Sequence, residues 1–212
     1  MTWITLLSAV SIFAGAEAKS LRWDFEDQTA GQPPKGWTAA KTGEGKGSEW
    51  KIVEDASAPK GTKVLAQVSS EAPGSLFNLC VAEEATLCDL DLSVAFKAVT
   101  GEGDQGGGPM WRYRDPNNYY VARMNPLEKN YRVYKVVNGK RTQLGSATVD
   151  APTGKWHTIR VVHKADHIQC YLNGKPLLDV KDDTFKEAGK IGLWTKADAV
   201  TYFDDLQVRG EQ

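Results

Sequence analysis

Hydrophobic and polar residues alternate with a period of two along most of the chain. Between residues 90 and 97, Leu90, Leu92, Val94 and Phe96 alternate with polar or small residues. Successive side chains of a β-strand point to opposite faces, so this pattern predicts a strand with one buried face. The segments WHTIRVVH and HIQCYL repeat the alternation. No segment has the 3.6-residue period of an amphipathic helix, and DDTFKEAGK could form one helical turn at most.

Turn residues divide these runs into short strands. Asn138-Gly139 and Asn173-Gly174 each lie between two strand-like runs. Both central positions of a type I′ turn need a positive φ, which Asn and Gly tolerate, so each pair predicts a hairpin. About a dozen short strands at close spacing predict an all-β, antiparallel sandwich in one domain. We expect long loops at residues 30–47 and, rich in glycine, at 100–109.

The first residues resemble a secretory signal. An apolar run over residues 3–14 is followed by the small-x-small site Ala16-Glu17-Ala18. This layout predicts a signal peptide over residues 1–18, cleaved after Ala18, and a single secreted or periplasmic domain over residues 19–212. A buried N-terminal strand or helix is the alternative. No later apolar run approaches bilayer length, so we expect no membrane contact in the mature form.

The charge composition excludes some classes of binding partner. The chain has 26 basic and 27 acidic residues, a balance that predicts no general attraction to nucleic acid or to anionic membranes. We expect a monomer. Of the three cysteines, Cys170 alternates with apolar residues and should lie in the core. Cys80 and Cys88 flank a short turn, where they either form a bond in an oxidising compartment or pack separately.

The segment NNYYVARMNPLEKNYRVYKVVNG, residues 117–139, carries arginines and aromatic residues inside strands. If the turn at residues 126–129 joins two antiparallel strands, Arg123 faces Arg132 and Val121 faces Tyr134. Extending this register back through the preceding turn would set Arg114 opposite Tyr119. The opposite face would then bury Trp111, Tyr113, Tyr120, Ala122, Met124, Tyr131 and Val133. One surface would collect eight polar or aromatic residues: Arg112, Arg114, Tyr119, Arg123, Asn125, Asn130, Arg132 and Tyr134.

Two arginines directly opposite each other need an explanation, because like charges across a strand pair are destabilising. Acidic neighbours such as Asp89, Asp91 or Glu128 would neutralise them. Alternatively, guanidinium groups and aromatic rings form a site for a hydroxyl-rich or carboxylated ligand. Trp194 alternates away from apolar neighbours, and as an exposed ring it would either stack on a sugar or cover a loop.

Several segments together resemble a known superfamily. FEDQTAGQPPKGW, GKWHTIRVVH, YLNGKPLLDV and GKIGLWTKADAVTYFDDLQV are similar to the concanavalin A-like lectin/glucanase superfamily. The resemblance is strongest to its laminin-G-like and 3-keto-disaccharide hydrolase branch, which is family 16 glycoside hydrolase-like. It implies a jelly roll of two curved sheets, with glycan binding or sugar chemistry on the concave sheet.

Three classes of function remain. The first is recognition of an oligo- or polysaccharide through Arg112, Tyr119, Arg123, Asn125, Arg132, Tyr134 and Trp194, and four arginines on one face favour an acidic glycan. The second is hydrolysis of 3-keto or plain disaccharides. The third is a protein-binding adhesion module. Whether the chain is an enzyme stays open: the E-x-D-x-x-E motif of the β-glucanases is absent, yet Asp89, Asp91, Asp104 and Glu128 are available as paired acids.

The two ends of the domain suggest a metal. WDFED opens it and TYFDDLQV closes it. In related jelly rolls the first and last strands share a structural calcium, and this resemblance implies the same here. Asp204 has the parity of Leu206 and Val208, so its carboxylate should point inward and need a partner or a cation. We predict a Ca²⁺ site at Glu26 and Asp204, with a salt bridge or solvent exposure as the alternative.

Overall fold

The computed structural model describes residues 19–211, and the predicted signal peptide at residues 1–18 lies outside them. The described part contains fifteen β-strands and no helix. Correspondingly, none of residues 19–211 forms a helix long and apolar enough to cross a membrane.

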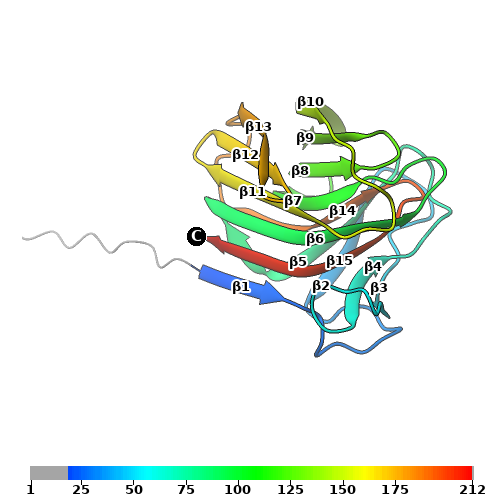
Figure 1. Ribbon diagram of the computed structural model, residues 1–212. Helices are drawn as coiled ribbons and strands as arrows, with labels where there is room; N and C mark the ends of the chain where they lie inside the picture. Colours follow the sequence, from blue (N-terminus) through cyan, green and yellow to red (C-terminus); the bar gives the residue numbers. More distant parts are fainter. Residues whose placement is uncertain (1–18, 212) are drawn as a thin grey trace, which may run out of the picture.

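The strands form two antiparallel sheets that face each other (Figure 1). Sheet A has the order β13-β12-β11-β6-β15-β4-β3, with β1 paired to β15. Its strands are β1 (Lys19–Trp23), β3 (Trp50–Glu54), β4 (Lys63–Gln67), β6 (Leu90–Thr100), β11 (His157–Lys164), β12 (His167–Leu172), β13 (Lys175–Lys181) and β15 (Val200–Gly210). Sheet B has the order β10-β9-β8-β7-β14-β5-β2. Its strands are β2 (Trp37–Thr42), β5 (Phe77–Leu87), β7 (Gly107–Asp115), β8 (Asn118–Asn125), β9 (Asn130–Val137), β10 (Lys140–Thr148) and β14 (Gly189–Lys196). The predicted all-β sandwich is therefore confirmed.

The main core lies between the two sheets and follows the period-two pattern. The apolar residues of β6, from Leu90 to Phe96, are buried there with Ile159 and Cys170. Cys80 also lies in this core, and the three cysteines are all free, so the structure contains no bond between Cys80 and Cys88. The two cysteines therefore pack separately, Cys80 in the core and Cys88 partly buried outside it.

Both predicted hairpins form. The Asn138-Gly139 turn has φ values of 50° and 77°, and the Asn173-Gly174 turn has 51° and 78°. The loop predicted at residues 30–47 is only partly correct, because residues 37–42 form β2 at the edge of sheet B. Its Trp37 contributes a buried ring to the main core, which the loop interpretation did not expect.

The register of β8 against β9 is as predicted. Arg123 pairs with Arg132, Val121 with Tyr134 and Asn125 with Asn130. The register predicted for β7 is wrong. Trp111 pairs with Tyr120 and Asp115 with Asn118, so three residues of β7 stand opposite Tyr119 alone. This bulge includes Arg112 at a φ of 47°, and it sends residues 112–114 away from their predicted positions.

Candidate functional site

The outer face of sheet B, which points away from the main core, carries its own hydrophobic cluster. This outer cluster alternates with the core residues of the same strands and consists of Phe77, Leu79, Val81, Met110, Tyr119, Val121, Tyr134, Val136 and Trp194. Tyr113, predicted to be a core residue, packs against this cluster because of the bulge in β7. Although this face points away from the main core, most of the residues in the outer cluster are fully buried.

Next to the outer cluster, Glu128 lies between the two opposed arginines. Its Oε2 is 2.9 Å from Arg123 Nη2 and 3.3 Å from Arg132 Nη1. The hydroxyl of Tyr134 lies 3.3 Å from Arg123 Nη1 and 3.4 Å from Arg132 Nη1. Three acidic residues were predicted as neutralising partners, and of these it is Glu128 that lies between Arg123 and Arg132. Asp89 pairs with Arg112 and Asp91 with Arg160 instead.

Asp104, on the loop before β7, packs against Arg123. One of its oxygens accepts hydrogen bonds from Gly106 N at 2.7 Å and Asn125 Nδ2 at 2.9 Å. The other accepts from Lys196 Nζ at 2.8 Å, and Arg123 Nη2 lies 3.7 Å from the carboxylate. A Cβ at Gly106 would come within 2.3 Å of Arg123 Nε, so the glycine allows the loop to pack on the guanidinium. Within residues 19–211, the backbone of this glycine-rich loop therefore packs against the Arg123 side chain.

The electrostatics of this cluster keep Glu128 ionised. Burial would raise the pKa of Glu128, but hydrogen bonds from Asn130 and Arg123, together with the charge of Arg132, lower it to about 2. The cluster holds four cations, Arg123, Arg132, Lys196 and Arg141, against the two carboxylates Asp104 and Glu128. Arg123 is buried, and its Nε has no hydrogen-bond partner in the described structure, whereas its Nη2 forms the ion pair with Glu128. The cluster therefore carries excess positive charge.

Arg141, on β10, is a site residue that the sequence reasoning missed. Its guanidinium carbon lies over the rings of Tyr134 at 4.4 Å, Phe77 at 5.0 Å and Trp194 at 5.7 Å. A signal for it was present. The Asn138-Gly139 hairpin pairs Arg141 with Val136, which has the same parity as Tyr134. Extending the predicted face by one more strand would have included it.

Some of the predicted ligand-binding residues lie together in this cluster, and others are buried beside it. Arg123, Asn125, Arg132 and Tyr134 are brought together, as expected. Tyr119 and Trp194 do lie on this face, but both are fully buried, and Trp194 Nε1 donates to Tyr119 Oη at 3.2 Å. The expectation of an exposed Trp194 ring is therefore wrong, because Arg141 and the neighbouring aromatic rings cover it.

Arg112 is not part of this surface. Because of the bulge, its side chain is buried elsewhere and donates to the carbonyls of Phe185 and Cys88 and to Asp89. Arg114 is exposed, with its guanidinium carbon 5.2 Å from the Phe185 ring. Placing Arg112 and Arg114 beside Arg123 was therefore incorrect.

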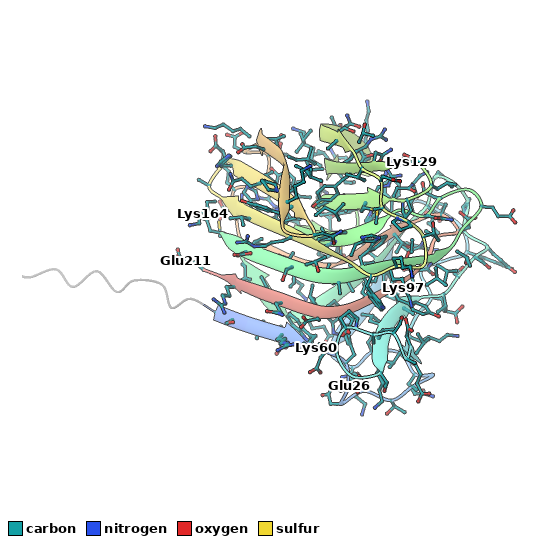
Figure 2. The ribbon with its side chains drawn as sticks, viewed as in Figure 1. Glu26, Lys60, Lys97, Lys129, Lys164 and Glu211 are labelled. Carbon is teal, nitrogen blue, oxygen red and sulfur yellow. The ribbon has the colours of Figure 1, made fainter. Side chains whose placement is uncertain are left out.

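The two residues predicted to bind calcium approach the same turn. Glu26 Oε1 accepts from Thr62 N at 2.8 Å and Lys63 N at 2.6 Å, while Asp204 Oδ2 accepts from Lys60 N at 2.8 Å. Glu26 and Lys60 are labelled at this corner in Figure 2. Asp204 is fully buried, and burial raises its pKa to about 6, with further repulsion from Asp205 and Asp24. No group of three or more His, Cys, Asp or Glu side chains in residues 19–211 has the arrangement of a metal site.

A calcium ion at this corner would need backbone carbonyls to complete its ligands, and Lys63 Nζ already donates to the carbonyls of Glu26 and Gln28, at 2.8 Å each. Each carboxylate oxygen has two lone pairs, so the amide hydrogen bonds leave Asp204 with acceptor capacity. No lysine or arginine forms an ion pair with Asp204 among the described residues. Ca²⁺ accepts carboxylate and carbonyl oxygens in flexible geometry.

A family model described as a 3-keto-alpha-glucoside-1,2-lyase-like domain matches residues 24–209. None of the curated proteins matches the chain. Among solved structures, the carbohydrate-binding module CBM66 from Bacillus subtilis is similar, with 18% identity and a TM-score of 0.65 over 84% of this chain and 96% of that chain. The cellulose-induced protein Cip1 is similar at 12% identity and a TM-score of 0.63, over 89% of this chain and 96% of that one. The carbohydrate recognition domain of Emp47p has 16% identity and a TM-score of 0.58, over 91% and 95%. At these identities the similarity establishes the fold alone.

Proposed function

Because the chain belongs to the family of 3-keto-alpha-glucoside-1,2-lyase-like domains, we propose that it recognises a glycan on the outer face of sheet B. The observation that carries the proposal is the ion-pair cluster of Arg123, Glu128 and Arg132 with Tyr134. Its cations outnumber its carboxylates, and the Glu128 and Arg132 side chains are partly exposed, so a ligand can reach them. The fold is shared with a carbohydrate-binding module and a carbohydrate recognition domain, which supports this class of ligand.

The accessible part of the cluster is formed by Glu128 and Arg132, whose side chains are 39% and 32% exposed. Lys129, labelled in Figure 2, marks the β8–β9 turn beside them. Sugar hydroxyls both donate and accept hydrogen bonds, so the Glu128 carboxylate and the Arg132 guanidinium offer complementary partners. Because neighbouring groups already hold both side chains, little rotamer entropy remains to be lost on binding.

Catalysis is the second candidate, and the family model favours it. A 1,2-lyase acting on a 3-keto sugar needs a base to remove the proton beside the ketone. With a pKa of about 2, Glu128 is a weak base, and Asp104 is committed to Lys196, Asn125 and Gly106. Incubation with 3-keto-alpha-glucosides and plain disaccharides, followed by detection of released sugar, tests this candidate. Turnover that is lost in Glu128→Gln would replace binding as the conclusion.

Arg132→Ala and Glu128→Gln are expected to weaken glycan binding about tenfold or more while the fold stays intact, since both side chains are partly exposed. Titration calorimetry with glycans found on an array would measure the loss. Arg114→Ala removes an exposed arginine at a distance from the cluster and should leave binding unchanged. Equal affinity for all four proteins, or an array without any bound glycan, would contradict the proposal. The third class, a protein-binding module, would then gain support.

We further propose a structural Ca²⁺ at Glu26 and Asp204. Since a ligand that binds only the native state stabilises it by mass action, chelation should lower Tm by roughly 5–10 °C when the metal was present at about 100 times its Kd. Asp204→Asn should remove the effect of the chelator. Asp27→Asn, an exposed acid of the same segment, should keep it. A melting curve that does not respond to the chelator, in protein that contains no metal, would exclude the site.

A secreted or periplasmic location remains part of the proposal. The signal peptide predicted over residues 1–18 supports it, and glycan ligands are abundant outside the cell. Determining the N-terminus of the exported protein tests it: the mature chain should start at Lys19.

A further inference from the structure

Arg141 differs from the other cations of the cluster because it has no counter-charge. Arg123 and Arg132 contact Glu128, and Lys196 contacts Asp104. No carboxylate within residues 19–211 forms an ion pair with Arg141. Its Nη1 is buried and lacks any hydrogen-bond partner there. A buried guanidinium N–H without an acceptor is unfavourable. The Arg141 residue as a whole is only partly buried, which leaves part of it open to a ligand.

The guanidinium is nevertheless held in place. Three aromatic rings, Tyr134, Phe77 and Trp194, lie within 4.4 to 5.7 Å of its central carbon. Cation–π contacts of this kind fix the plane of the group without using its N–H donors. The arginine is therefore preorganised, and little conformational entropy would be lost when a ligand binds.

We infer that Arg141 is the anion-binding residue of this surface, and that the glycan it accepts carries a carboxylate or a sulfate. The inference rests on the proposed function. A neutral sugar would need only single hydrogen bonds, whereas a guanidinium fork pairs with an anionic group through two. The neighbouring groups add to this preference, since the cluster has four cations and two carboxylates. Tyr134, beneath Arg141 and between Arg123 and Arg132, joins the anion site to the rest of the surface.

Matched pairs of oligosaccharides test the charge directly. One pair is an oligogalacturonate and its methyl ester, and the other is a sulfated oligosaccharide and its desulfated form. Calorimetry should give at least about tenfold tighter binding for the charged member of one pair. That affinity should fall as NaCl is raised, while the neutral member is unaffected, because salt screens exposed charges. The pair that shows the difference identifies the anionic group.

Variants assign the effect to Arg141. Arg141→Gln should remove the preference for the charged member, and Arg141→Lys should keep part of it. The matched control is Lys140→Gln, which loses the same charge from an exposed neighbour on the other face of β10. Equal binding of both members by the wild type, or an unchanged preference in folded Arg141→Gln, would refute the anion site and leave glycan binding standing. If neither member of any pair, nor any neutral glycan, binds the wild type, the proposed function itself fails.

Discussion

Replacing Asp104 with alanine should lower the free energy of unfolding by about 3–5 kcal/mol. The side chain is fully buried, and it accepts hydrogen bonds from Lys196, Asn125 and the Gly106 amide. Alanine would leave the Arg123 guanidinium, 1% exposed, with the partly exposed Glu128 as its remaining counter-charge. Removing one member of a buried ionic network costs more than the network contributes, because the remaining charge keeps its desolvation penalty.

Denaturant unfolding followed by tryptophan fluorescence would measure the effect of Asp104→Ala. Glu102→Ala is the control, because Glu102 lies in the same loop with an exposed side chain. Its expected change is within about 0.5 kcal/mol. Asp104→Asn keeps the shape and one acceptor, so its loss should fall between the two. An Asp104→Ala protein as stable as Glu102→Ala would show that the network contributes no net stability.

The same network corrects an expectation about Arg123. From the sequence, Arg123 opposite Arg132 predicts repulsion, and truncating Arg123 should relieve it without harm to the fold. In the structure Glu128 lies between the two guanidinium groups, and Arg123 is buried against Asp104. Arg123→Ala should therefore destabilise the protein, and loss of binding in that variant would not identify a ligand contact. Arg132, which is partly exposed, is the better probe.

Local rules were sufficient for the β8–β9 pair. A short turn at residues 126–129 and a strict period of two determine which side chains face each other, so the Arg123–Arg132 pairing could be derived without a structure. The asparagine–glycine hairpins were equally local, because the positive φ values belong to two adjacent residues.

Non-local features could not be predicted in this way. No sequence rule indicates that β7 bulges at residues 112–114, and with this bulge the Arg112 side chain contacts Phe185, Cys88 and Asp89 instead of Arg123. Asp104 enters the site from a loop, whose path depends on tertiary contacts with Arg123 and Asp198. The burial of Trp194 depends on Arg141 from β10, a strand four positions away in sheet B.

Between about pH 7 and pH 4.5, the free energy of unfolding should depend on two buried groups, His163 and Asp204. Their contributions change in opposite directions as the pH falls. Burial, and then the nearby charge of Arg112, lower the pKa of His163 from 6.5 to about 4. The unfolded chain therefore takes up a proton before the folded one does, and stability falls as the pH drops below 6.5. This loss is about 2–3 kcal/mol by pH 4.5. Asp204 acts in the other direction: its pKa is raised from 3.8 to about 6, so the folded state is protonated first and gains stability below pH 6.

Variants should separate these two contributions, and the slope of stability against pH is the readout, because each substitution also changes the absolute value. Asp204→Asn should reveal the full acid loss due to His163, whereas His163→Gln should abolish the loss and leave a gain. His167→Gln changes a partly exposed histidine paired with Asp179 and should follow the wild type. A chelator should be present, since a cation at Asp204 would keep its carboxylate ionised and cancel the gain. If His163→Gln loses stability toward pH 4.5 as steeply as Asp204→Asn does, the acid sensitivity lies elsewhere. Glu128 and Asp182, each with a pKa of about 2, do not explain a loss in this window, because their contributions are lost only below about pH 4.5.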